Sequence, residues 1–311
     1  MTSAITIDHP LFGDATRRRP SLGGLARAAW IAPVVAGLLV MTVYPTVFLI
    51  ALALSRSTLG KPFRKFAGFD QIAHVVTDPL FLATVVRSVG FALVSTTAEL
   101  LLGFLIALLF AGLFRTGRIL TGLILLALTT PPVMVGVAWK LILAPAGGLL
   151  NGLLLQSGLV EAPVSFLGTP WLAWASIVLA DIWHWTPFVV ILAFAALMGI
   201  PNDVEEAAQV DGATPWQRLR LVTLPLVAAP LASIFLLKLI IAFKLFDLVY
   251  VLTFGGPGFA TTTSGFAIWR LGLQEFDVGT AAAQTLVYAL VVGLATLPVV
   301  RLHQRFEAGR S

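Results

Sequence analysis

The residues of this sequence best placed to do chemistry are ionisable side chains within or beside apolar stretches. A charged group at the centre of a membrane helix costs roughly 2.5 to 3.5 kcal/mol on insertion scales, so each needs a partner or a polar interior position. For the two deepest, Glu99 and Lys238, lining a path and bracing a helix bundle are equally open interpretations. The full set is Arg87, Glu99, Lys140, Asp181, Lys238, Lys244 and Asp247.

Two local spacings within this set suggest pairings on a helix surface. Lys244 and Asp247 are three residues apart, and we favour an ion pair across one helical turn over a role in a cavity. Asp181, His184 and Trp185 follow the i, i+3, i+4 spacing that places side chains on one face. That face offers polar groups beside an aromatic ring, as a sugar site does, although tryptophan also collects at membrane interfaces without any ligand.

Several kinds of chemistry are excluded by what the sequence lacks. Cysteine is absent, and the four histidines are too far apart to suggest a helical pair of metal ligands. No Gly-x-x-x-x-Gly-Lys-Ser/Thr loop is present to bind ATP phosphates. We therefore assign no catalytic residue, metal or cofactor, and we expect the energy for any transport to come from a partner.

The composition is that of a membrane protein. Apolar residues make up 58% of the 311 residues and charged residues 11%, against roughly 25% charge in soluble domains. Crossing about 30 Å of hydrocarbon takes roughly 20 apolar residues. The sequence predicts an all-α membrane protein with six transmembrane helices, near 29–54, 88–112, 118–142, 172–198, 223–245 and 281–300.

The distribution of basic residues predicts how these helices are oriented. With a cytoplasmic N-terminus, eleven basic residues fall in inner segments and five in outer segments, which favours cytoplasmic N- and C-termini. Because the basic residues that give the net charge of +5 lie mainly at the membrane edges, we expect no nucleic-acid partner. The predicted organisation is a tail at 1–28, a membrane domain at 29–302 and a second tail at 303–311.

The third predicted span is interrupted near its middle by Pro131 and Pro132. Prolines remove backbone donors and leave carbonyls that need other partners or a water-filled cavity. A helix broken in this way either lines a cavity or absorbs a kink in its packing, and the residues alone leave both open. Turn formers at 145–148 and 255–258 predict breaks in the outer loops at 143–171 and 246–280.

The long inner loop, residues 199–225, has the pattern of a helix-turn-helix. Asn202 or Asp203 can cap a first helix with acidic residues in its first turn, and Gly212 can end it in the left-handed conformation. Thr214 can cap a second short helix that begins at Pro215 and carries Arg218 and Arg220 near its end.

This loop resembles the EAA loop of the permeases of binding-protein-dependent ABC importers. The pattern Glu-Ala-Ala, three residues, Gly, nine residues, an Ile, one residue, Leu-Pro falls on Glu206 to Ala208, Gly212, Val222 and Leu224 to Pro225, with Val222 in place of the Ile. Further similarity to the carbohydrate-uptake branch covers most of residues 29–302. It includes Trp139 in the third span and Phe243, Lys244 and Asp247 at the end of the fifth.

The resemblance implies a permease that moves a sugar across the bacterial inner membrane by alternating access. It implies an ATP-hydrolysing subunit dimer, a second permease subunit and an extracytoplasmic sugar-binding protein as partners. The residues expected to couple to the ATPase are Glu205, Glu206, Ala207, Ala208, Asp211, Gly212 and Pro225. The candidate residues of the substrate path are Glu99, Trp139, Asp181, His184, Trp185, Lys238, Phe243, Lys244 and Asp247.

Two other classes of protein stay open at this point. An ion-coupled secondary transporter would use the intramembrane charges as a proton or sodium path, but many such folds show internal symmetry, which we do not find here. A subunit that only scaffolds an assembly would have an empty bundle interior.

Basic groups outnumber acidic ones by four to three among the intramembrane residues, which favours an anionic sugar by a single residue.

Overall fold

The computed structural model of the chain describes residues 24–112, 122 and 126–308. The chain divides into two compact units, Met1–Phe48 and Leu49–Ser311. Two parts of the predicted organisation lie outside the described residues. They are most of the two tails, at 1–23 and 309–311, and the short inner segment between the second and third predicted spans, at 113–117.

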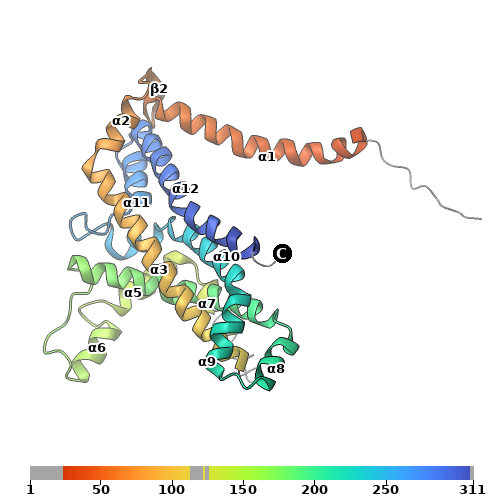
Figure 1. Cartoon of the computed structure of the whole chain (residues 1–311). Helices are drawn as coiled ribbons and strands as arrows, with labels where there is room; N and C mark the ends of the chain where they lie inside the picture. Colours follow the sequence, from red (N-terminus) through yellow and green to blue (C-terminus); the bar gives the residue numbers. More distant parts are fainter. Residues whose placement is uncertain (1–23, 113–121, 123–125, 309–311) are drawn as a thin grey trace, which may run out of the picture. The chain divides into compact units, whose positions relative to one another are not determined.

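The described elements are almost all helical, which confirms the predicted fold class (Figure 1). In chain order they are α1 Gly24–Ala53, β1 Ser55–Thr58, β2 Lys61–Phe66, α2 Asp70–Thr77, α3 Pro79–Gly112, α5 Pro132–Ile142, α6 Leu149–Gln156, α7 Pro170–Met198, α8 Asn202–Val210, α9 Pro215–Arg218, the π-helix η1 Leu219–Thr223, α10 Leu224–Ala242, the π-helix η2 Val249–Thr253, α11 Ser264–Trp269, the π-helix η3 Arg270–Gln274 and α12 Val278–Ala308.

Five helices of the described chain are long and apolar enough to cross a membrane: Ala29–Ala53, Pro79–Gly112, Pro170–Met198, Pro215–Ala242 and Val278–Arg305. The third predicted span is represented by the shorter apolar helix α5. Helical residues 126–129 precede it, and the helix breaks at Thr130 and Pro131, where the prolines predicted an interruption.

The first unit consists of the N-terminal part of α1 within its described residues. Large apolar side chains of this helix are exposed along its length, Trp30 and Met41 by about four-fifths of their surface. Such a helix needs lipid or another chain around it, because a helix that is apolar on all sides is stable only when buried or in a membrane.

The core of the second unit is built by α3, α7 and α10, with α12 packed against α3 and α10. Helices α3 and α7 approach closely at Gly103, where an added Cβ would lie 2.6 Å from Val189 Cβ. A small residue at such a crossing lets two membrane helices pack backbone to backbone. These three helices carry the deeply buried charges.

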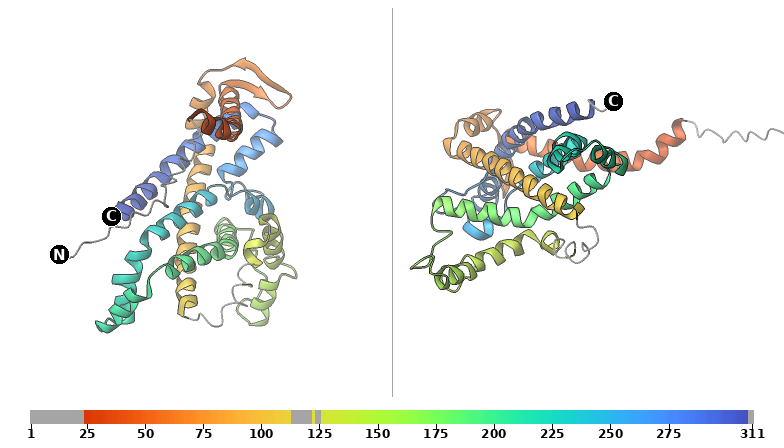
Figure 2. Two further views of the ribbon diagram at one scale, coloured as in Figure 1. Left: turned by 90° about the vertical axis from the view of Figure 1, so that its right-hand side faces the viewer. Right: turned by 60° about the horizontal axis from the view of Figure 1, so that its bottom comes forward.

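The two ends of the second unit have different structures (Figures 1 and 2). Helices α8 and α9 form one end, whereas α2 and the β1–β2 hairpin lie at the opposite end. The hairpin pairs Ser55 with Phe66 and Thr58 with Lys61. The segment between the first two predicted spans, residues 55–87, thus contains the hairpin, helix α2 and the start of α3.

Helix α3 begins nine residues before the predicted start of the second span. Asp78 Oδ1 accepts a hydrogen bond from Leu80 N at 2.9 Å, and Pro79 occupies the first helical position, so the start of the helix is stabilised locally. Arg87 lies inside this extension and donates from Nη1 to the Thr262 carbonyl oxygen at 3.1 Å. The predicted span began only after Arg87, because this charged residue interrupts an otherwise apolar stretch that starts at Pro79.

Candidate functional site

Three of the predicted intramembrane charges meet in one buried cluster, the Glu99–Lys238–Asp181 triad. Lys238 Nζ on α10 lies 2.9 Å from Glu99 Oε2 on α3 and 3.1 Å from Asp181 Oδ2 on α7. The three side chains are at most 5% exposed. One ammonium group therefore joins the three core helices, which are far apart in sequence.

The two contacts of Lys238 differ in quality. The contact to Asp181 has hydrogen-bond geometry. The contact to Glu99 is an ion pair by distance, yet neither Glu99 oxygen has a hydrogen-bond partner within the described residues. We take both as electrostatic contacts, because at 2.9 Å attraction between the charges does not depend on hydrogen-bond angles.

A cavity of about 150 Å³ lies next to the triad. Asp181, His184 and Trp185 line it from α7, and Lys244 and Asp247 line it from the segment after α10. Glu99 and Lys238 do not belong to this lining. The Trp185 ring lies between the two features, since it lines the cavity and its centroid is 5.4 Å from Lys238 Nζ.

The break before α5 supplies a contact for this cavity wall. His184 Nε2 lies 3.0 Å from the Thr130 carbonyl oxygen, and since a carbonyl can only accept, Nε2 is the protonated nitrogen. The helix break at Pro131 thus leaves the Thr130 carbonyl open to a side chain of α7. Thr130 was not among the predicted site residues, although the prolines that follow it were the signal.

The predicted ion pair between Lys244 and Asp247 is wrong. In the described part of the chain Lys244 forms no ion pair with Asp247, because α10 ends at Ala242 and the two residues do not share a helical turn. Both line the cavity instead.

Two further candidate path residues lie outside the cavity lining. Phe243 is 3% exposed and packs in the core, where its carbonyl oxygen accepts a hydrogen bond from the Tyr288 hydroxyl at 2.7 Å. Trp139 packs against the same core and its ring lies 6.4 Å from that of Trp183. Both positions are structural in this conformation of the chain.

The inner loop forms the predicted first helix, α8, and the predicted glycine stop. Gly212 has φ +74°, and Ala213 N donates to Ala208 O at 3.0 Å across the end of α8. The predicted cap by Asn202 or Asp203 is wrong, because Pro201 is the N-cap residue and no side chain bonds the first turn.

The second helix of the loop begins as predicted and ends differently. Thr214 Oγ1 accepts from Gln217 N at 3.3 Å, and Gln217 Oε1 accepts from Thr214 N at 2.8 Å, which completes a capping box. The helix then continues through η1 into α10, so Arg218 and Arg220 lie near its start. Leu224 N bonds Leu219 O five residues back, and this wider turn admits Pro225, which has no N–H.

Most residues of this inner loop are exposed to solvent. Helix α8 buries none of its residues, and Glu205, Glu206, Ala207, Asp211 and Gly212 are all exposed. Val210 and Trp216 are 87% and 68% exposed. Exposed apolar side chains rimmed by charged ones are typical of a protein interaction surface.

A bundle of apolar helices long enough to span a membrane, ending in an exposed helix pair, is the arrangement of a multi-pass membrane protein. The family model described as "Binding-protein-dependent transport system inner membrane component" matches residues 99–311, and the chain belongs to that family. The predicted resemblance is thereby confirmed, and this chain is a permease component of a binding-protein-dependent ABC importer.

Named relatives match nearly the whole chain. A trehalose/maltose transport system permease protein of Thermococcus litoralis is 33% identical and covers 92% of this chain and 95% of its own length. A lactose transport system permease protein of Rhizobium radiobacter is 28% identical, covering 89% and 93%. A trehalose transport system permease protein of Mycobacterium tuberculosis is 30% identical, covering 85% and 84%.

Solved structures confirm the fold. A bacterial ABC transporter involved in the import of the acidic polysaccharide alginate matches with a TM-score of 0.79 at 24% identity, covering 90% of this chain and 96% of that chain. The MetNI methionine ABC transporter matches with a TM-score of 0.56 over 73% of this chain and 96% of its own. These comparisons give no support to the ion-coupled alternative.

Proposed function

We propose that this permease imports a sugar or sugar derivative across the bacterial inner membrane by alternating access. The observation that carries the proposal is the exposed α8–Gly212–α9 loop, joined without a break to the spanning helix α10. Movement of this loop by a partner would be transmitted directly to the helix that holds Lys238. The names of the relatives, which include trehalose, maltose and lactose permeases, support the substrate class.

We propose that a separate ATP-hydrolysing subunit docks on this loop, so that the permease itself hydrolyses nothing. The exposed Val210 and Trp216 would supply apolar contacts, and the acidic side chains would set the orientation. The coupling residues proposed are Glu205, Glu206, Ala207, Ala208, Asp211, Gly212 and Pro225. With this loop in the cytoplasm, both chain termini are cytoplasmic.

The proposed substrate contact is the cavity of Asp181, His184 and Trp185. The carboxylate and imidazole can bond hydroxyl groups, and the indole ring offers an apolar plate. The lining carries one ammonium group, Lys244, and two carboxylates, Asp181 and Asp247, so the cavity has no excess positive charge and a neutral sugar fits it better than an anionic one. Glu99 and Lys238 would not contact the sugar, and would instead position Asp181 through the triad.

The remaining parts of the proposal concern the assembly. A second permease subunit would complete the path, and an extracytoplasmic binding protein would deliver the sugar. One solved relative is an alginate transporter in complex with a pentasaccharide-bound periplasmic protein, which supports this arrangement. The membrane domain proposed is 29–302, with tails at 1–28 and 303–311.

Transport in vesicles tests the proposal. The chain would be reconstituted with its ATPase, its partner permease and its binding protein, and uptake of labelled trehalose, maltose and lactose would be measured. Uptake of at least one sugar that requires both ATP and the binding protein is expected. Uptake driven by a proton or sodium gradient without ATP would overturn the proposal.

A further inference from the structure

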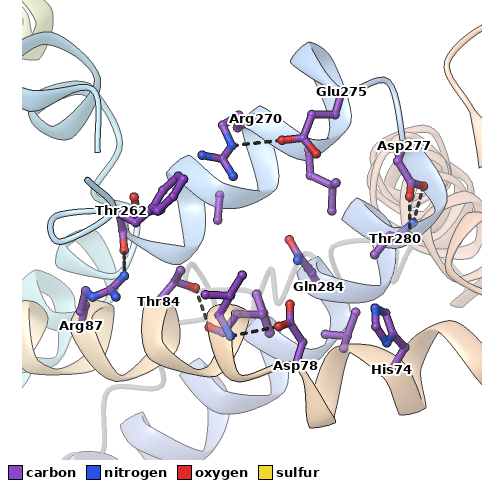
Figure 3. A pocket seen from close by; sticks show the side chains of 16 residues that line it. His74, Asp78, Thr84, Arg87, Thr262, Arg270, Glu275, Asp277, Thr280 and Gln284 are labelled. Atoms are coloured by element: carbon purple, nitrogen blue, oxygen red, sulfur yellow. Dashed lines mark hydrogen bonds and ion pairs between the residues drawn. The ribbon is translucent and has the colours of Figure 1, made fainter. Parts of the chain in front are cut away.

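Figure 3 shows a second cavity, of about 340 Å³. It is lined in part by α2, which lies at the end of the second unit opposite the coupling loop in Figure 1. Its walls come from α2, the first turns of α3, η3 and the start of α12, and it shares no residue with the cavity beside the triad. Its size is at the lower end of that of small-molecule sites. It lies outside the proposed transport site, and its side chains have no role in the function argued above.

Part of its polar lining is already paired and forms a rigid wall. Asp277 accepts from Thr280 N at 3.0 Å and from Thr280 Oγ1 at 2.8 Å, which fixes the start of α12. Arg270 Nε bonds Glu275 Oε1 at 3.2 Å, and its guanidinium lies 5.0 Å from the centroid of the Phe259 ring. These contacts orient the side chains of Asp277, Arg270 and Glu275 in the cavity wall.

Three other lining groups have unused capacity. Gln284 is 8% exposed, points into the cavity in Figure 3, and its Oε1 has no hydrogen-bond partner within the described residues. Asp78 Oδ1 accepts a hydrogen bond from Leu80 N, whereas Asp78 Oδ2 has no hydrogen-bond partner among the described residues. Arg87 donates only to the Thr262 carbonyl and has no carboxylate partner there.

An amide oxygen buried without a partner costs about 1 to 3 kcal/mol, so a ligand hydroxyl that donates to Gln284 would recover that cost. Asp78 can accept from a second hydroxyl, and Arg87 can donate to a third or to a ring oxygen. Spare acceptors and a spare donor around one cavity match a polyhydroxylated molecule, whose groups both donate and accept. The lining carries three carboxylates against two guanidinium groups, so it has no excess positive charge to favour an anion.

We propose that this cavity is a second sugar site, which holds one neutral sugar unit at the outer end of the permease, with Gln284, Asp78 and Arg87 as its ligands. The choice of a sugar as the ligand rests on the proposed function, whereas the site itself rests on the unused polar groups. Its placement on the outer side follows from a cytoplasmic coupling loop.

The test uses the absence of cysteine from the chain. Leu80 lines the cavity and is 75% exposed, so Leu80→Cys introduces a single reactive thiol at its rim. The full complex in vesicles would be alkylated with millimolar trehalose, maltose or lactose present, and modification of this chain would be followed by mass spectrometry. We expect at least one sugar to slow the alkylation.

Gln284→Leu in the same background keeps the size of the side chain and removes its polar group. It should raise the sugar concentration needed for protection about tenfold, the effect of losing one buried hydrogen bond. Thr285→Val is the matched control, because Thr285 Oγ1 bonds the carbonyl of Ala281 within α12, and it should leave protection unchanged. Arg87→Gln provides a second variant at a half-buried position should Gln284→Leu fail to assemble.

Three outcomes would overturn the inference. They are no protection by any of the sugars, protection that survives both Gln284→Leu and Arg87→Gln, and protection by the sugar-free binding protein alone, which would make the cavity a docking surface. ATP-dependent sugar uptake without protection would contradict the second sugar site and leave the proposed function intact. Protection without ATP-dependent uptake would contradict the proposed function and leave the second sugar site intact.

Discussion

At the scale of single residues, the arrangement of the triad explains how charge is kept inside an apolar bundle. Lys238 is within 3.1 Å of two carboxylates, and all three side chains are almost inaccessible. Taking charges out of water is costly, and only close, opposite partners offset that cost. The triad therefore stabilises the relative positions of α3, α7 and α10 more than it stabilises the fold as a whole.

Removing the shared cation should be strongly destabilising. Lys238→Met leaves two buried carboxylates without a partner, and we expect a loss of about 3 to 5 kcal/mol, seen as a lower thermal unfolding midpoint of the purified protein. The matched control is the triple variant Glu99→Gln, Asp181→Asn, Lys238→Met, which has no buried charge and should be closer to wild type. Equal midpoints for Lys238→Met and wild type would contradict this account.

The aromatic wall of the inner cavity gives a second prediction at this scale. Trp185→Ala removes the ring that lines the cavity and lies over Lys238, and we expect the KM for the transported sugar to rise about tenfold, because aromatic contacts are worth about 0.5 to 1.5 kcal/mol beyond the area they bury. Trp185→Phe keeps a ring and should retain most of the affinity. Unchanged uptake kinetics in the alanine variant would exclude a substrate contact.

At the scale of elements, local chemistry decided what could be predicted. The Gly212 stop and the Thr214 cap follow from backbone preferences that act within a few residues, and both are confirmed. The pairing of Glu99 with Lys238 and Asp181 joins residues up to 139 positions apart, and hydropathy holds no information about such contacts. The continuation of the loop helix into α10 was also missed, because a π-helical turn absorbs the proline that would be expected to end it.

The capping box offers a direct test of how firmly the loop is built. Thr214→Ala removes the side-chain bond to Gln217 N, and a lost cap costs about 1 kcal/mol. Amide exchange in residues 216–218 should become several-fold faster, with no change in α7. Thr214→Ser keeps the hydroxyl and should restore the wild-type rate. If exchange stays the same in the alanine variant, the cap does not hold this helix in the membrane-embedded protein.

At the scale of the whole molecule, the described chain has the features of a component that works inside an assembly. The described part of α1 has no buried residue across its apolar window, and α8 has none at all. Lipid, a second permease and an ATPase would cover these surfaces. The family of the chain could be predicted from one loop, because the spacing of Glu206, Gly212 and Pro225 is specific, whereas the sugar could not, because the cavity residues come from elements that only the fold brings together.

The central claim is that the α8–Gly212–α9 loop couples this permease to a separate ATPase, and co-purification tests it most directly. Gly212 has φ +74° and an added Cβ would meet no atom within 4 Å, so the constraint there is conformational and not steric. Asparagine tolerates this backbone region, and valine does not.

The tagged chain would therefore be purified from its native membrane as wild type, Gly212→Asn and Gly212→Val, and co-purifying subunits would be quantified. The account predicts that wild type and Gly212→Asn recover an ATPase and a second permease, and that Gly212→Val loses the ATPase but keeps the second permease. Equal recovery of the ATPase with all three chains, or its absence from all three, would contradict it.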